Sequence, residues 1–208
     1  MQNFRFLNIL LLTILGMVTV TFNTYGQSNI SDPGVVINGV KWATRNVDKP
    51  GTFADKPEDF GRFYQWNYSR SYPATGEISE NDWNKSWTTN LVWEKSNDPS
   101  PAGWRVPTLD EIKQLLDTNK VSNKWTTQNG INAKKFTDRT TGNSLFLPAA
   151  GYRHNNNGTL SNIGRYGFYW SSTQSVSGYA NYLTFHSDYA SRRGSNRYYG
   201  SSIRAVAE

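Results

Sequence analysis

The amino-acid sequence predicts an α+β fold made of small twisted antiparallel sheets, one or two helices and long loops. An Asn38-Gly39 pair separates the apolar runs Val35–Ile37 and Val40–Ala43, and such a pair favours a tight hairpin turn because both residues tolerate positive φ. A single clear helical pattern follows Thr108. From Ser122 onward, short apolar runs alternate with polar loops, as expected of strands.

The helix has both a start signal and an apolar face. Thr108 and Glu111 form a capping-box pattern, which closes the first turn of a helix. The apolar residues then recur at helical spacing; they are Leu109, Ile112, Leu115 and Leu116. A second, weaker helix is predicted at residues 90–95.

The other predicted elements are strands and one long connection. Strands are expected at residues 60–66, 144–148, 167–172, 179–186 and 202–206. Residues 67–101 lack periodicity and predict long loops pinned by Trp83, Trp87 and Trp93; loops this long are commonly functional. Because one composition persists from first strand to last, residues 35–208 are predicted to form a single domain.

The N-terminus has the pattern of a secretory signal peptide over residues 1–26. Arg5 precedes an uncharged apolar run, Phe6–Phe22, and small residues occupy the −3 and −1 positions at Thr24 and Gly26. An uncleaved anchor is the alternative, but the run is shorter than the roughly 20 residues that span a bilayer. Lipid attachment is excluded because no cysteine follows. We expect a flexible leader at 27–34, no stable membrane span after cleavage, and a secreted, periplasmic or cell-surface location.

Composition excludes several classes of site. The chain has no cysteine, which removes thiol nucleophiles, thiolate metal ligands and disulfides. Its net charge of +6 is scattered, which argues against nucleic acid as a partner. The two histidines, His154 and His186, lack the spacing of a zinc site. Loop oxygens could suggest calcium, but we interpret them as solvated loop polarity; they are Glu80, Asn81, Asp82, Asn84, Asn97 and Asp98. No metal or cofactor is predicted.

Catalytic motifs are also missing. There is no Gly-x-Ser-x-Gly element, and no spacing singles out a pair of carboxylates for glycoside hydrolysis. We therefore predict no catalytic residues. Trp66, Trp104 and Trp170 are interpreted as core. Arg105 and Arg204 lie in apolar segments, where a guanidinium must be paired, and we expect both to form ion pairs with internal acids, with Glu111 as one candidate.

Four ordered segments of this sequence carry a resemblance to a known family. In chain order they are Gly61–Trp66, Ala102–Thr108 with Glu111, Leu147–Arg153, and Tyr169–Thr173 with the terminal Ser202–Val206. Together they closely resemble the Fibrobacter succinogenes major paralogous domain (FISUMP), over about Gly34 to Val206. Gly103–Thr108 alone is less specific, because it also resembles formylglycine-generating enzymes. That activity requires paired cysteines, which this chain lacks.

The resemblance implies a C-type-lectin-like fold with few helices, much loop and chain ends close together. The chain is also similar to the variable proteins of diversity-generating retroelements, which display a changeable C-terminal surface. That similarity implies a framework at 170–172, Leu183, Phe185, Gly200 and 202–204. The displayed ligand-binding set would be Tyr179, Asn181, Tyr182, Thr184, His186, Asp188, Tyr189, Arg192, Arg193, Tyr198 and Tyr199.

A physical argument supports binding by the same segment. Leu183 and Phe185 alternate with Tyr182, Thr184 and His186, so the strand is expected to turn the first two inward and the other three outward. Tyrosine and arginine are enriched at binding surfaces and hot spots.

We therefore expect an exported or cell-surface recognition protein, not an enzyme. Its ligand would be a protein or glycan on a cell or matrix surface. Two alternatives stay open, a carbohydrate-active hydrolase that uses loop carboxylates and a structural surface or pilus-tip module.

The signal-peptide interpretation predicts a mature N-terminus within a few residues of Gln27, because the leader is short and has no lipid attachment site. Intact-mass measurement of exported protein checks this. A mass equal to that of the full 208-residue chain would contradict the predicted cleavage.

Overall fold

The computed structural model describes residues 31–86 and 91–208. The predicted signal peptide and Trp87 lie outside these residues. The elements in chain order are β1 (Val35–Ile37), β2 (Val40–Trp42), β3 (Arg62–Tyr64), β4 (Ser71–Pro73), η1 (Glu80–Asp82), η2 (Lys95–Asn97), β5 (Trp104–Arg105), α1 (Leu109–Leu115), β6 (Val121–Gln128), β7 (Ile131–Asp138), β8 (Ser144–Pro148), β9 (Tyr152–Arg153), β10 (Leu160–Ser161), β11 (Gly167–Gln174), β12 (Tyr179–Phe185), β13 (Ala190–Asn196) and β14 (Val206–Ala207).

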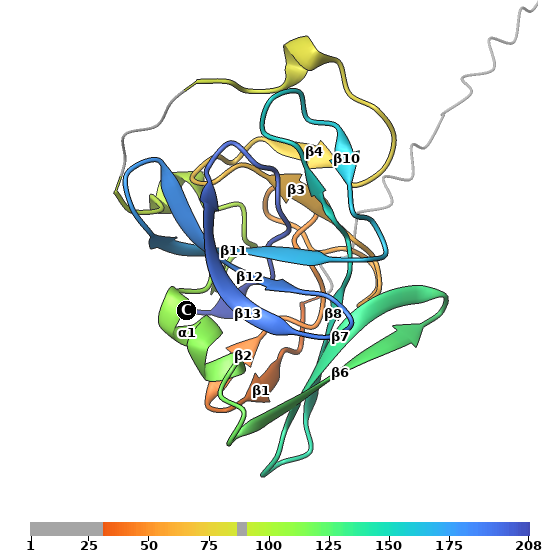
Figure 1. The fold of residues 1–208 in the computed structure, drawn as a ribbon. Helices are drawn as coiled ribbons and strands as arrows, with labels where there is room; N and C mark the ends of the chain where they lie inside the picture. Colours follow the sequence, from red (N-terminus) through yellow and green to blue (C-terminus); the bar gives the residue numbers. More distant parts are fainter. Residues whose placement is uncertain (1–30, 87–90) are drawn as a thin grey trace, which may run out of the picture.

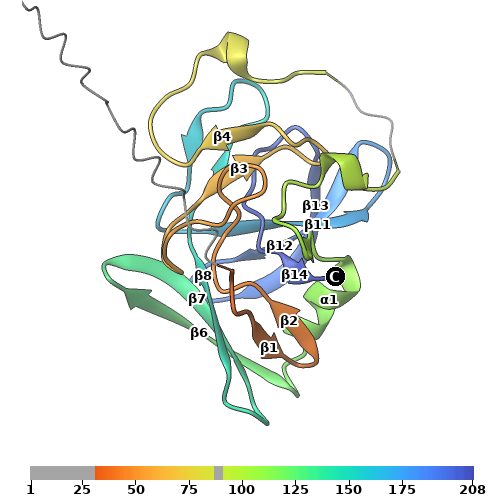
Figure 2. The ribbon, with the colours of Figure 1, turned by 180° about the vertical axis from the view of Figure 1, so that it is seen from behind.

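The strands form five small antiparallel sheets, which confirms the α+β class (Figure 1). Their orders are β1-β2-β14-β5, β11-β12-β13, β6-β7-β8, β3-β4 and β10-β9. The C-terminal strand β14 lies between β2 of the N-terminal hairpin and β5, and Figure 2 shows it close to helix α1. In the described ranges α1 is the one α-helix, while η1 and η2 are short 3₁₀ turns. The helix predicted at 90–95 is wrong for residues 91–94, which are not helical.

The N-terminal hairpin forms where its turn residues predicted. Strands β1 and β2 pair in register, with Ile37 opposite Val40. Asn38 and Gly39 have φ values of 46° and 82°. Two consecutive positive φ values match the twist of the flanking strands, and only a few residue types adopt them readily. Below this hairpin, Ile37 and Trp42 are buried.

Helix α1 begins at the predicted capping box. The Thr108 hydroxyl accepts from the Glu111 amide, and the Glu111 carboxylate accepts from the Thr108 amide. Arg105 donates two hydrogen bonds to the same carboxylate, at 2.9 and 2.6 Å, which confirms the predicted ion pair. Burial raises the pKa of Glu111, but the hydrogen bonds from Arg105 and Thr108 outweigh it and hold that pKa below the usual range. Glu111 therefore joins β5 to the first turn of α1.

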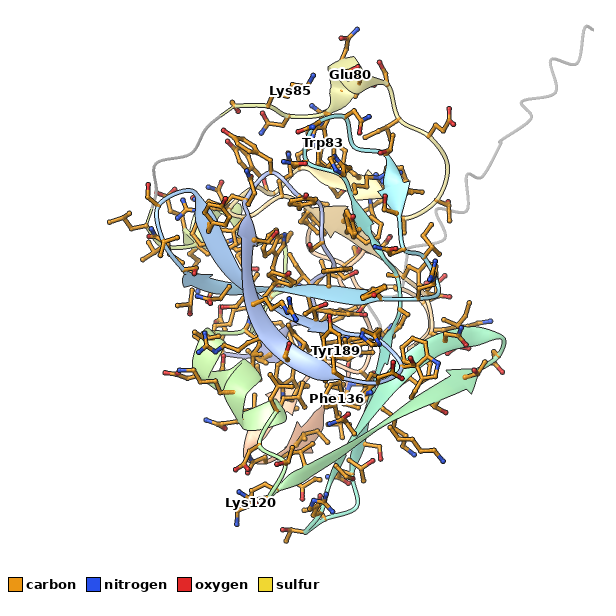
Figure 3. The ribbon with its side chains drawn as sticks, viewed as in Figure 1. Glu80, Trp83, Lys85, Lys120, Phe136 and Tyr189 are labelled. Carbon is orange, nitrogen blue, oxygen red and sulfur yellow. The ribbon has the colours of Figure 1, made fainter. Side chains whose placement is uncertain are left out.

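The interior contains two main apolar clusters. The first lies between the β11–β13 sheet, α1 and the β6–β8 sheet, and Figure 3 labels one of its members, Phe136. The second is built around Trp66 and Trp170, which are fully buried as predicted. Trp104 is only half-buried, stacking edge-to-face on Phe53, so its assignment to the core is wrong. The Trp104 ring lines a hollow of about 510 Å³ that also includes Trp93 and Arg105.

Arg204 is buried, but the ion pair that the sequence predicted for it does not form. Its guanidinium donates to the Asn46 side-chain oxygen at 2.9 Å and to the Ala43 carbonyl at 3.2 Å. Among the described residues no carboxylate lies within ion-pair distance of it, so the expected ion pair is wrong for Arg204. Burial lowers the pKa of Arg204 to about 10. An amide oxygen and a carbonyl, which both accept from a cation, thus take the place of the expected carboxylate at Nε and Nη1, while Nη2 is buried without a hydrogen-bond partner among the described residues.

The predicted flexible leader is wrong for its described part, residues 31–34. Asp32 is buried and accepts hydrogen bonds from the amides of Gly34 and Thr44 and from the Arg45 side chain, each at 2.9 Å. Burial raises the pKa of Asp32, but these bonds outweigh it and lower the pKa overall. This carboxylate fixes the chain just before β1. No helix within the described ranges is long and apolar enough to cross a membrane.

Burial predicts unequal effects of two tryptophan substitutions. Trp170→Ala should lower the free energy of unfolding by about 3–5 kcal/mol, because it leaves a cavity in the core. Trp104→Ala should cost less, since its half-exposed ring leaves no enclosed cavity. Denaturant unfolding of both variants measures the difference. Equal losses would place Trp104 in the core.

Candidate functional site

The two faces of the β11–β12–β13 sheet have different surroundings. Trp170 lies opposite Tyr182 and Tyr169 lies opposite Leu183, and successive residues of a strand point to opposite faces. Tyr169, Leu183 and Phe185 point into the first apolar cluster. The other face carries Tyr182 and Phe168, whose rings are 5.7 Å apart.

On this second face, aromatic side chains from several segments form one continuous surface, which we call the aromatic face. It includes rings from β9, β11, β12 and the connections around them, and neighbouring ring centroids are 4.0 to 6.0 Å apart. Its members are His154, Tyr199, Tyr152, Phe168, Tyr182, Tyr166, His186 and Tyr189, together with Arg193, whose guanidinium lies 5.6 Å from the Tyr189 ring.

A hollow of about 190 Å³ opens in the aromatic face. Its lining consists of Tyr152, Asn162, Phe168, Tyr182, Ser195, Tyr199 and Ser201. The rings of Tyr152 and Phe168 meet edge-to-face at 4.9 Å, and those of Tyr152 and Tyr199 at 5.3 Å. These contacts hold the rings in a fixed arrangement.

The polar groups of the hollow are available to a ligand. Within the described residues, the hydroxyls of Tyr152, Tyr182 and Tyr199 make no hydrogen bond, nor does the side-chain amide of Asn162. Desolvation raises the pKa of Tyr182 and of Tyr199, so both phenols stay protonated donors at neutral pH. A ligand can therefore both stack on rings and exchange hydrogen bonds here.

The β12–β13 turn carries the residues at the other end of the aromatic face, among them Tyr189 (Figure 3). Lys134 on β7 is buried and donates to the carbonyls of His186 and Ser187, at 3.2 and 3.0 Å. Desolvation lowers the pKa of Lys134. The His186 ring contacts the Tyr189 ring at 4.0 Å, edge-to-face. The turn is thus anchored from below while its rings face outward.

The structure brings together five of the eleven residues predicted for binding. Tyr182, His186, Tyr189, Arg193 and Tyr199 all belong to the aromatic face. Tyr182 contributes differently from the expectation, because only 9% of it is exposed and it packs on Trp170. It forms a wall of the hollow and not a freely displayed side chain.

Two further predicted residues are buried, and their assignment to the displayed set is wrong. Asn181 is 5% exposed and donates to the carbonyls of Thr173 and Gln174. Thr184 is 1% exposed. The expected inward-outward alternation fails because β12 is the central strand of its sheet. Side chains therefore cover both of its faces: the apolar cluster on one side and the aromatic rings on the other.

The remaining predicted residues are accessible but lie apart from the aromatic face. Arg192 pairs with Leu183, so it points to the opposite side of the sheet from Arg193. Tyr179 is 46% exposed and lies two residues before Asn181 on β12, so both point to the same side of the sheet. Tyr198 is half-buried, with its carbonyl bound by Gln65. Asp188 is exposed at the turn and accepts from the Ser187 hydroxyl.

Seven site residues were not predicted from the sequence. They are Tyr152, His154, Asn162, Tyr166, Phe168, Ser195 and Ser201. A usable signal exists for two of them: Tyr166 and Phe168 alternate with the buried Gly167 and Tyr169, which places them on the other face of β11. The others arrive from separate segments, and no local pattern connects them.

A family model described as a domain of unknown function (DUF8237) matches residues 119–206. The matched region begins just before β6 and includes β11, β12, β13 and every residue of the aromatic face. No curated protein and no solved structure matches this chain.

Carboxylates gather at a second hollow, of about 470 Å³, which includes Asp48, Asp55, Glu58 and Asp59 in its lining. Glu58 is occupied by the side-chain amides of Asn129 and Gln128. The Asn129 bond is the main reason that its pKa is lowered, which keeps it ionised and makes it a poor general acid. No group of three acidic or histidine side chains in the described ranges is placed to hold a metal.

The loop acids considered for calcium are engaged by protein groups. Glu80 pairs with Lys85 at 2.7 Å at the surface (Figure 3). Asp82 pairs with Arg70 at 3.7 Å, and both of these side chains are exposed. Asp98 accepts from the amides of Ser100 and Val106. These contacts agree with the interpretation of the acids as loop polarity.

The burial of Tyr182 predicts how two substitutions differ. Tyr182→Ala should lower the free energy of unfolding by about 2–4 kcal/mol, because it removes a large ring packed on Trp170. Tyr182→Phe should change it by less than about 0.5 kcal/mol, since the hydroxyl has no partner to lose. Denaturant unfolding measures both. A loss below about 1 kcal/mol for the alanine variant would instead indicate that Tyr182 is a freely displayed side chain.

Proposed function

We propose that this chain is a recognition protein that binds a protein or glycan on a cell or matrix surface through the aromatic face. The observation that carries the proposal is the hollow in that face, lined by rings whose hydroxyls have no partner among the described residues. Polar groups left open in a rigid aromatic setting are typical of ligand sites, where a few of them fix the ligand's orientation.

The composition and support of the face favour binding. Tyrosine supplies a large contact area at low conformational entropy cost, and arginine is enriched among hot-spot residues. Strands β11 and β12 hold the rings of Phe168 and Tyr182, and Lys134 anchors the turn that carries His186 and Tyr189. Such preorganisation lowers the entropy lost on binding.

We also propose that the chain has a C-type-lectin-like fold of the FISUMP kind. The position of the two ends of the domain supports this. Strand β14 pairs with β2 at Val206 and Trp42, so the two ends of the domain share a sheet. The small sheets and long loops agree with the same fold. We also propose that the chain is exported, because residues 1–26 have the pattern of a secretory signal peptide. Tyr189 and Arg193 could vary among related chains without disturbing the core, as the similarity to variable proteins implies.

A double substitution tests the aromatic face. The mature chain is applied to arrays of glycans and of peptides, and the affinity for the best ligand is then measured in solution. Tyr189→Ala combined with Arg193→Ala should weaken that affinity by about tenfold or more, because two hot-spot types are removed. The melting temperature should move by only a few degrees, since neither side chain is buried.

The matched control removes the same kinds of side chain elsewhere. Phe146→Ala with Arg139→Ala deletes a half-buried ring and an exposed arginine; Phe146 lines a different hollow, beside Val35 and Thr126. This control should keep full affinity. If the control loses binding and the face variant keeps it, the ligand site lies on the β6–β8 side and the proposal fails.

A further inference from the structure

We propose that the hollow bounded by Tyr152, Phe168, Tyr182 and Tyr199 binds one uncharged hexopyranose ring, which makes a glycan the ligand class of the aromatic face. This inference rests on the function proposed above and specifies its ligand. It follows from the size of the hollow, the arrangement of its rings, its open polar groups and its charge.

The size of the hollow limits the ligand to a single ring. Its volume of about 190 Å³ is below the roughly 300–1,000 Å³ of sites that enclose drug-sized molecules. The hollow also opens onto the surface of the β11–β13 sheet, so the rest of a longer chain can continue along the aromatic face. A terminal or internal sugar unit meets both conditions.

The rings that line the hollow stand at different angles, so both ring faces and ring edges are available to a ligand with C–H bonds on its faces. Tyr152 stands at 77° to Phe168 and at 75° to Tyr199, whereas Phe168 and Tyr182 differ by only 31°. The face of an aromatic ring carries negative electrostatic potential, which attracts polarised C–H groups. A pyranose presents such groups on its faces and hydroxyls around its edge.

The open polar groups require a ligand that both donates and accepts. The lining offers phenol hydroxyls, the Asn162 amide and the hydroxyls of Ser195 and Ser201, and within the described residues these side chains make no hydrogen bond. Filling the hollow with an apolar side chain would remove these groups from water without replacing the lost hydrogen bonds. Sugar hydroxyls both donate and accept, so they can replace them.

Charge argues against the other ligand suited to an aromatic enclosure, an organic cation. Aromatic cages hold quaternary ammonium groups through the ring faces. Here no carboxylate lines the hollow within the described residues, and the charged side chain acting most strongly on the Tyr182 hydroxyl is the cation Arg193, its partner across β12 and β13. A cationic ligand would be repelled.

The walls are fixed by the backbone on both sides. Tyr152 precedes Arg153, whose buried guanidinium donates to the carbonyls of four residues: Pro73, Thr75, Gly76 and Gly158. Tyr199 precedes Gly200, whose amide and carbonyl both pair with the backbone of Arg153. The two tyrosine walls are thus tied together, and the hollow exists before a ligand enters.

Ligand-observed saturation-transfer NMR and titration calorimetry on the mature chain test this inference. The probes are the methyl β-pyranosides of glucose, galactose and mannose at millimolar concentration. Phenol represents an aromatic peptide side chain, and tetramethylammonium represents an organic cation. At least one pyranoside should bind with saturation transfer strongest at its ring C–H protons, and phenol and tetramethylammonium should not displace it.

Two variants locate the site. Tyr199→Ala removes one wall and should weaken pyranoside binding by about tenfold or more. Asn162→Gly removes the amide and keeps the backbone, because Asn162 has φ of 60°, which glycine adopts freely. It should weaken binding by about threefold to tenfold. Phe146→Ala, in a different hollow, should have no effect. If Tyr199→Ala fails to fold, Tyr199→Phe removes only the hydroxyl and should also weaken binding.

Three results would overturn the inference. They are binding of phenol or tetramethylammonium in the hollow in place of every pyranoside, absence of saturation transfer to all three pyranosides, and pyranoside binding that survives both Tyr199 and Asn162 substitutions in folded protein. The function proposed above stands or falls separately. It survives any of these results if the Tyr189 and Arg193 double variant still loses the array ligand.

Discussion

The whole structure depends on the backbone of the C-terminal segment, residues 200–206, which runs through the centre of the domain. Segments far apart in the sequence each hydrogen-bond to it, and without it the small sheets would have little to join them. The pairs are Gly200 with Arg153, Ser201 with Tyr64, Ser202 with Phe168 and Trp170, Ile203 with Val47, Ala205 with Ala43, and Val206 with Trp42 and Arg105. The sequence contains no cysteine, so no disulfide can link these segments. The backbone hydrogen bonds and the apolar clusters hold them together instead.

The same segment builds the candidate site. Tyr199 enters the aromatic face immediately before the chain turns inward at Gly200, where an added Cβ would lie 2.9 Å from the Trp83 ring and 3.0 Å from the Arg153 side chain. Because Gly200 pairs with Arg153, the walls contributed by Tyr199 and Tyr152 are placed relative to each other by the core. The aromatic face is therefore tied to the interior through these backbone hydrogen bonds, although it consists of loop ends and strand faces.

Local signals in the sequence predicted local structure well. The Asn38-Gly39 turn, the capping box of Thr108 and Glu111, and the pairing of Arg105 with Glu111 each depend on residues close together in the chain. The tyrosine-rich segment contributes five of its eleven predicted residues to the candidate site. Its alternation pattern was misleading, because periodicity reports which residues share a face and not whether a second layer covers that face.

The sequence by itself determined the fold class, the helix, the N-terminal hairpin and the absence of cysteine chemistry, since these follow from residue type and spacing. Only the tertiary structure decided that β12 is a central strand, that Thr184 and Asn181 are buried, and that Arg204 donates to Asn46 instead of an acid. It also decided that Tyr152 and Tyr199 form one hollow. The reason is physical: burial and side-chain contact depend on which distant segments meet, and that pairing is made by long-range backbone hydrogen bonds through residues 200–206.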